Sequence, residues 1–375
     1  MIYFDAAATT LQKPPAVAAA MQTAMRTMSS PGRGGHPAAM LAAETAFQCR
    51  SELAEMFGMK DPAQVVFTQN ATHALNIAIK SLVPSGGEVV ISGYEHNAVT
   101  RPLAALGADV RVAAAPLFRQ EEVVEAFRRQ ITPKTCAVIC NHVSNVFGFV
   151  QPIEEVAALC RRRGVPLIVD ASQSAGILPL DLTALGAAFI AMPGHKGLYG
   201  PQGTGVLLCG EGSVTKTLLE GGTGSLSLQQ QMPDFLPDRL EAGTHNMPGI
   251  AGLLEGVRYV RRKGERTICE RERRLAMLTA EGIRMLNAVK VFALPDIRAQ
   301  VGVVSFSATK VRAETIAERL GEREIAVRAG LHCAPLAHYS AGTGETGTVR
   351  LSFSDFNTPG EVYHFLAELR GCLRE

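Results

Sequence analysis

Polar side chains that could do chemistry follow five short apolar runs of this 375-residue chain. Taken singly, each has an ordinary explanation as a helix cap, a structural histidine or a solvated lysine. Five such ends in succession, with a carboxylate, an imidazole and an amine among them, predict a functional site. In chain order the residues are Thr68, Asn70 and Thr72, then Glu95 and His96, then Asn141, Ser144 and Asn145, then Asp170 and Gln173, and finally His195 and Lys196.

The elements that must position these side chains are strands of one sheet. From about residue 62 to 209, β-branched runs at 65–67, 89–91, 110–112, 137–139, 167–169 and 189–191 alternate with longer helical patterns, which predicts βαβ units around a mostly parallel sheet. Several runs are apolar on consecutive residues, as in strands that helices cover on both faces. Ligands of such α/β folds bind beyond the carboxyl ends of the strands, where the polar residues stand.

The composition changes after Gly221, first to a Gly/Ser/Gln-rich stretch and then to a charged helical pattern from about 249 to 286. Beyond it, strand and helix patterns predict a smaller α+β domain. Its last helix has a capping box, with Thr358 as cap and Glu361 three residues on. We therefore expect an N-terminal segment at 1–15, a large domain at 16–248, and a linking helix with a small domain at 249–375.

Charge and cysteine content exclude several classes of protein. With 37 basic and 35 acidic side chains the chain has no field that would gather nucleic acid, and 47% hydrophobic residues suit a soluble enzyme. The uncharged stretch 135–153 contains too many polar residues for a membrane span, so we expect a buried strand and a site loop there. No signal peptide is evident, and eight cysteines without paired short spacings indicate neither a disulfide framework nor a metal cluster. We expect a cytoplasmic protein.

Two glycine motifs imitate nucleotide-binding loops. The segment 342–347 has the letters of GxGxxG, but a strand pattern follows where a dinucleotide fold needs a helix, so we expect a flexible loop. The segment 210–217 nearly fits a P-loop, yet Thr215 stands where the second glycine is required. Without a P-loop, Asp170 has no metal-binding role beside a nucleotide.

Pyridoxal phosphate (PLP) explains an acid at one strand end and a lysine at another. Lys196 would form the Schiff base, and Asp170 would keep the pyridine nitrogen protonated so that the ring is an electron sink. Ala71 and Thr72 open a predicted helix whose N–H groups suit the phosphate, and His96 could stack on the ring.

The sequence resembles the cysteine desulfurases and selenocysteine lyases, class V aminotransferase-like members of the fold-type I PLP enzymes. The resemblance covers nearly the whole chain, in the family's order of blocks. The most specific block is Gly194 to Gly203, with the sequence GHKGLYGPQG. The others are 3–10, 94–97, 142–148, 169–174, 241–246, 328–335 and 349–353.

The resemblance implies roles for particular residues. Lys196 would be the Schiff-base lysine, Asp170 would bind the pyridine nitrogen and Gln173 the ring oxygen. His96 would lie on the ring face, with Thr72 and His195 on the phosphate. The segment around Thr244 resembles one that completes the phosphate site of a neighbouring subunit, which implies a homodimer. Pro193 departs from the family, which often has a small hydroxyl residue there.

Two further residues decide the reaction. Arg350 would clamp the substrate carboxylate together with Asn145, although a solvent-facing strand position is the ordinary alternative. Cys333 resembles the sulfur-accepting cysteine, and its short loop resembles the second desulfurase group; buried, inert cysteine is the alternative. A positive charge nearby would raise its thiolate fraction.

The expected reaction converts L-cysteine to L-alanine and leaves the sulfur on Cys333 as a persulfide for a possible acceptor protein. Lys196 would move the α-proton while Cys333 attacks the substrate sulfur. Three alternatives stay open: a selenocysteine lyase acting on L-selenocysteine, another class V aminotransferase or C–S lyase, and a catalytically idle sulfur-relay scaffold.

Overall fold

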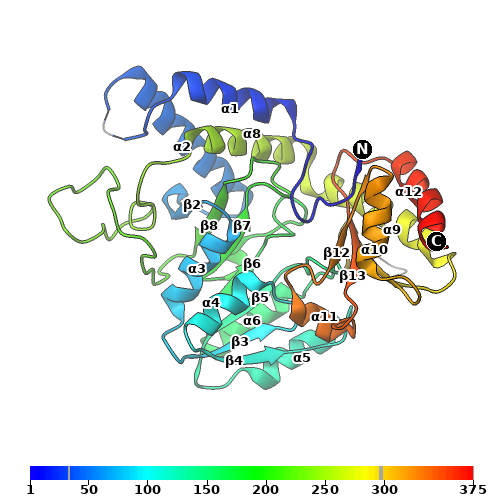
Figure 1. Cartoon of the computed structure of the whole chain (residues 1–375). Coiled ribbons are helices and arrows are strands. Elements are labelled where there is room, and N and C mark those ends of the chain that lie inside the picture. The colour runs from blue at the N-terminus through cyan, green and yellow to red at the C-terminus, as the bar shows by residue number, and fades with distance from the viewer. Residues whose placement is uncertain (33, 295–298, 375) are drawn as a thin grey trace.

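The computed structural model describes residues 1–32, 34–294 and 299–374. A large sheet with helices on both faces occupies one half of the molecule, and a smaller sheet with its own helices the other (Figure 1). This arrangement confirms the predicted α/β class. No helix in these described ranges is long and apolar enough to cross a membrane.

The large sheet has the strand order β2-β8-β7-β6-β5-β3-β4. All six apolar runs predicted as strands are present, and β3 to β7 pair in parallel. The sheet also contains β8, which is antiparallel to β7 and β2 on either side. The strands are β2 (Val65–Thr68), β3 (Glu88–Ser92), β4 (Asp109–Ala113), β5 (Thr135–Asn141), β6 (Leu167–Asp170), β7 (Phe189–Pro193) and β8 (Gly205–Cys209).

Separate apolar cores cover the two faces of this sheet, because successive strand residues point to opposite sides. Val90 belongs to the core that contains Leu53 and Leu253, whereas Val89 belongs to the core with Leu75. The helices of this half are α1 (Pro15–Thr27), α2 (Pro37–Met56), the 3-10 turn η1 (Pro62–Gln64), α3 (Ala71–Leu82), α4 (Asn97–Ala105), α5 (Gln120–Gln130), α6 (Ile153–Arg163), α7 (Leu182–Leu185) and α8 (Met247–Lys263).

The smaller sheet is antiparallel and has the order β12-β13-β10-β9. The N-terminal strand β1 (Ile2–Tyr3) pairs in parallel with β11 (Ile325–Ala326), so the chain begins against this half and then crosses to the large sheet. The elements are α9 (Glu265–Arg284), β9 (Val289–Phe292), β10 (Val303–Ala308), α10 (Ala313–Glu322), β12 (Arg328–Gly330), α11 (Pro335–Ala341), β13 (Thr348–Ser352) and α12 (Pro359–Cys372). The capping box predicted at Thr358 is confirmed.

The link between the halves is two helices, not the single helix that the charge pattern predicted. The helices α8 and α9 meet at Gly264, whose φ of 86° suits a residue without a side chain. Leu253 of α8 lies in the large-sheet core, and Leu275 of α9 lies in the core of the smaller sheet. The domain division expected at residue 249 stays a prediction; on this packing we propose Gly264 as the boundary.

Candidate active site

A cavity of about 170 Å³ opens beyond the carboxyl ends of β5, β6 and β7, where the sequence predicted a site. It brings together ten of the candidate site residues named from the sequence, from the ends of five strands and the loops that follow them. Its lining is Ala8, Asn70, Ala71, Thr72, His96, Ala98, Asn141, Val143, Asn145, Asp170, Ser172, Gln173, Pro193, His195 and Lys196.

Lys196 lies in the turn after β7, with its amine buried. Burial lowers the pKa of this amine to about 8, although the nearby Asp170 raises it. The turn packs closely on the chain after β6: a Cβ at Gly197 would lie 2.4 Å from the carbonyl oxygen of Ala175. Glycine is therefore needed beside the lysine. A substantial fraction of neutral amine at pH 8 is what a Schiff-base lysine requires.

Asp170 ends β6 and is paired in register with Ala191 of β7, which sets the acid one strand from Lys196. Its Oδ1 accepts hydrogen bonds from the backbone N–H and the hydroxyl of Ser172, at 2.9 and 2.5 Å. Because both contacts are on Oδ1, the other oxygen can serve a ligand. Gln173 donates from Nε2 to the carbonyl oxygen of Ala7 at 2.9 Å, so the N-terminal segment fixes this amide.

His96 stands at the start of α4 and caps it, since its Nδ1 accepts from the N–H of Ala98 at 3.0 Å. Burial lowers the pKa of His96, and Asp170 opposes that shift. The neighbouring Glu95 is fully buried and accepts from the Ser92 hydroxyl at 2.6 Å and from the N–H of Asn141 at 2.7 Å. Burial raises the pKa of Glu95 to about 8. The acid supports the strand ends beneath the cavity in its protonated form at neutral pH.

One end of the cavity suits an anion. Asn70 caps α3 by accepting from the N–H of His73 at 2.9 Å, and Ala71 and Thr72 follow in the first turn. The free N–H groups of a helix start attract a phosphate. His195 lies at the same cavity, held through Nδ1 by the Thr9 hydroxyl at 3.0 Å, and burial lowers its pKa to about 4.

Thr244 is the predicted phosphate residue that does not line this cavity. It is exposed and lines a second cavity of about 180 Å³ together with Gln69 and Asn246. Nearby Glu241 is buried against Arg50 at 2.6 Å, which fixes the preceding residues of the segment. The phosphate role predicted for Thr244 stays a prediction.

Arg350 is almost wholly buried, with 2% of its surface exposed, so the solvent-facing alternative is wrong. Its guanidinium group makes hydrogen bonds to the N-terminal segment and to the loop after β5. Its Nη2 donates to Oδ1 of Asp5 at 2.7 Å and its Nη1 to the carbonyl oxygen of Asn145 at 2.9 Å. The buried Nε lacks a partner among the described residues. Two of the five N–H donors of the guanidinium are therefore used, and three, including that of Nε, remain, although Arg350 itself does not line the cavity.

Cys333 is exposed, whereas the other seven cysteines are buried or partly buried. Its loop touches the large domain at two points. Asn145 donates from Nδ2 to the carbonyl oxygen of His332 at 2.8 Å. The backbone N–H of Asn97 donates to the carbonyl oxygen of Cys333 at 2.8 Å. Cys333 itself does not line the cavity, but its loop is hydrogen-bonded to Asn145, which does, and to Asn97, which lies between the lining residues His96 and Ala98. Burial lowers the pKa of His332 to about 2, so this neighbour supplies no positive charge to the thiol at neutral pH.

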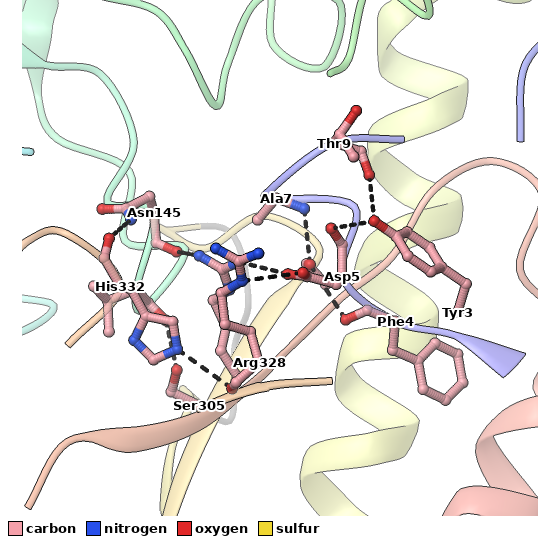
Figure 2. A network of polar contacts seen from close by, with 12 residues as sticks. Tyr3, Phe4, Asp5, Ala7, Thr9, Asn145, Ser305, Arg328 and His332 are labelled. Atoms are coloured by element: carbon pink, nitrogen blue, oxygen red, sulfur yellow. Dashed lines mark hydrogen bonds and ion pairs between the residues drawn. The ribbon is translucent and has the colours of Figure 1, made fainter. Parts of the chain in front are cut away.

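Sequence reasoning missed Asp5 and Arg328. Asp5 holds both arginines, since its Oδ2 accepts from Nε of Arg328 at 3.1 Å (Figure 2). The available signal was an acid inside the otherwise apolar opening block at residues 3–10. Its partners are more than 320 residues away, and no spacing rule connects them.

Comparison with known proteins agrees with this geometry. The model of the family "Aminotransferase class-V" matches residues 2–365. A probable cysteine desulfurase of Pyrococcus abyssi is 30% identical over 100% of this chain and 94% of its own, and one of Xylella fastidiosa is 33% identical over 98% and 90%. The solved apo structure of a cysteine desulfurase from Thermococcus onnurineus NA1 superposes with a TM-score of 0.90 at 30% identity, over 100% of this chain and 94% of that one. The chain belongs to the class V aminotransferase family.

Proposed function

We propose that the protein is a PLP-dependent cysteine desulfurase that converts L-cysteine to L-alanine and keeps the sulfur on Cys333. The observation that carries the proposal is that the loop of an exposed cysteine is hydrogen-bonded to Asn145, a lining residue of the cavity that also contains Lys196 and Asp170, and to Asn97 beside it. Similarity to probable cysteine desulfurases over the whole chain supports the same activity.

The cavity residues fit PLP. Asp170 has a free carboxylate oxygen for the pyridine nitrogen, and the start of α3 with Thr72 and His195 suits the phosphate. Lys196 would hold the aldehyde, and His96 would lie against the ring. Gln173 would reach the ring oxygen only through the hydrogen of Nε2 not given to Ala7. When bound, PLP supplies an electron sink that weakens the bonds at the substrate α-carbon.

Residues of the chain would orient the substrate and move its α-proton. Arg350 and Asn145 orient the substrate through its carboxylate, with the unpartnered Nε of Arg350 as an available donor. The amine of Lys196, whose lowered pKa leaves part of it neutral, would take the α-proton of the substrate and later return it to the product.

Sulfur transfer is the work of Cys333. The thiolate attacks the substrate sulfur, a sulfur–sulfur bond forms, and the carbon–sulfur bond breaks with its electron pair left on the carbon side. Protonation of that carbon gives alanine, and Cys333 carries the persulfide until a thiol or a sulfur-acceptor protein removes it.

We further propose a homodimer in the cytoplasm. Thr244 is exposed and does not line the cavity of its own chain, and a second copy could receive it beside the phosphate-binding residues of its site. In that arrangement each site would be complete only in the assembled pair.

The test is product analysis with purified protein and L-cysteine. We expect sulfide and alanine in equal amounts when a reducing thiol is present. A keto-acid product would show an aminotransferase instead, and turnover of L-selenocysteine without turnover of L-cysteine would show a lyase specific for selenium. Absence of any PLP chromophore would contradict every PLP reading and favour an idle scaffold.

A further inference from the structure

Two histidines lie in contact behind the Cys333 loop. His338 belongs to α11 and is fully buried, and His332 directly precedes Cys333. Their ring planes differ by 10° with centroids 5.6 Å apart, and Nδ1 of His332 is 3.3 Å from Nε2 of His338. Nearly coplanar rings at this distance suit one hydrogen bond between the two imidazoles.

The remaining ring nitrogens fix the direction of that hydrogen bond. Nε2 of His332 faces the carbonyl oxygen of Arg328 at 3.3 Å and must donate to it, so Nδ1 of His332 is the acceptor in the neutral ring. His338 then donates from Nε2, and its Nδ1 accepts from the Thr343 hydroxyl at 2.8 Å. Burial lowers the pKa of His332 to about 2 and that of His338 to about 4, which keeps both rings neutral.

Thr343 belongs to the glycine-rich segment 342–347, which the sequence analysis predicted to be a flexible loop. Gly342 ends α11 with φ of 69°, and the buried Thr343 donates its N–H to the carbonyl oxygen of His338 at 2.8 Å. A Cβ at Gly347 would lie 2.8 Å from the carbonyl oxygen of Gly330, three residues before Cys333. Gly347 therefore permits close packing against β12, the strand that leads into the Cys333 loop. Through this packing the segment stabilises the position of the loop.

The loop needs support because its backbone is strained. His332 and Cys333 are consecutive non-glycine residues in the left-handed region, with φ of 52° and 55°. Asn145 and Asn97 fix their carbonyl oxygens from the side of the cavity. The histidine pair adds a separate contact to the same turn, through the ring of His332.

We propose that His338 and Thr343 are positioning residues for sulfur transfer, which hold the backbone turn of Cys333 in place through the ring of His332. This role rests on the proposed function. It implies that breaking the histidine contact slows sulfur transfer while cofactor and substrate still bind normally.

The test compares three variants in the PLP-loaded enzyme. His338→Phe keeps a buried ring but removes both nitrogens, His338→Gln retains a donor near the position of Nε2, and His364→Phe, at an exposed site on α12, is the matched control. We expect His338→Phe to slow persulfide formation in a single turnover by about tenfold or more, as misplacement by a fraction of an ångström does. The spectral change on mixing with L-cysteine should be that of the parent, and His338→Gln should recover most of the rate.

A second readout is independent of desulfuration. The alkylation rate of Cys333 by iodoacetamide, followed by peptide mass spectrometry across pH, should change in His338→Phe and not in His364→Phe. Parent rates of both sulfur transfer and alkylation in His338→Phe would overturn the proposal. If that variant fails to fold, Thr343→Val, which replaces only the hydroxyl, tests the proposal by the rate of persulfide formation and the alkylation rate of Cys333. If the parent enzyme releases no sulfide, the proposed function fails while the alkylation arm still tests the support of the loop.

Discussion

At the scale of single residues, the amine of Lys196 and the carboxylate of Asp170 owe their chemistry to the strand ends that carry them. The charges of two acids, Asp170 and Asp5, and of two arginines act on the amine, and burial dominates the lowering of its pKa. The acid is oriented by both the N–H and the hydroxyl of Ser172. Each effect gives a measurable expectation.

The lowered pKa of Lys196 predicts how the cofactor-free protein takes up PLP. At a pH below its pKa of about 8 the amine is protonated and cannot attack the aldehyde. The rate of Schiff-base formation should therefore rise about tenfold per pH unit up to pH 8 and level off above it. Stopped-flow absorbance at fixed PLP checks this. A rate that keeps rising to pH 10, as for an exposed lysine, would contradict the buried site. Lys196→Ala should form no Schiff base in the cavity at any pH.

Asp170→Asn is predicted to retain fold and size but to lose the charge that keeps the pyridine nitrogen protonated. Turnover of L-cysteine should fall by about two orders of magnitude or more, because the electron sink weakens. Ser172→Ala is the matched comparison, since it removes one of the two hydrogen bonds to Asp170 and leaves the charge. Near-parent turnover by Asp170→Asn with cofactor bound would reject the role of the acid.

At the scale of elements, the N-terminal segment joins the two halves of the site. It pairs through β1 with β11, holds Arg350 and Arg328 through Asp5, and reaches His195 through Thr9. Because Arg350 is almost wholly buried, Asp5 compensates a charge that water cannot reach.

Asp5→Ala should leave that buried guanidinium unpaired. We expect a loss of about 3–5 kcal/mol in the free energy of unfolding, as for breaking other buried ion pairs. Urea unfolding measures this, with Asp109→Ala, an exposed acid on the edge strand β4, as control. A conservative Asp5→Asn variant that folds should show a changed KM for L-cysteine, since the orientation of Arg350 is altered. Unchanged stability in Asp5→Ala would show that Arg350 does not depend on this partner.

The large sheet was predictable because its strands are local apolar runs and its site residues follow those runs directly. Asp170 and Lys196 needed only the rule that parallel strands end at one edge. The antiparallel direction of β8 was not predicted, because β8 resembles its parallel neighbours in composition. The division between α8 and α9 at Gly264 was not predicted either, because the charged pattern continues across it. Asp5 could not be found, because its partners Arg328 and Arg350 are set by the pairing of distant strands.

At the scale of the whole molecule, the Thr244 segment lies apart from the cavity of its own chain. Large apolar side chains are exposed on α2 and on the long connection between β8 and α8, including Phe47 at 58% and Leu228 at 99%. Exposed apolar surface of this kind suits contact with another protein, and the proposed homodimer would supply it.

The dimer is predicted to retain PLP through Thr244. Light scattering should give twice the mass of one chain, and Thr244→Ala should lose cofactor faster on dialysis than the parent while remaining dimeric. Thr309→Ala, an exposed threonine of the smaller half, is the control. A monomer with full activity at assay concentration would contradict the shared site.

The central claim is that Cys333 takes the sulfur of L-cysteine, and a single-turnover experiment tests it most directly. PLP-loaded enzyme is mixed with one equivalent of L-cysteine without reductant, alkylated and mapped by mass spectrometry, alongside Cys333→Ala and the control Cys136→Ala, which changes a partly buried cysteine of β5. We predict a persulfide on Cys333 in the parent and in Cys136→Ala, and bound cofactor but almost no alanine in Cys333→Ala. Alanine formation by Cys333→Ala at the parent rate would contradict the account.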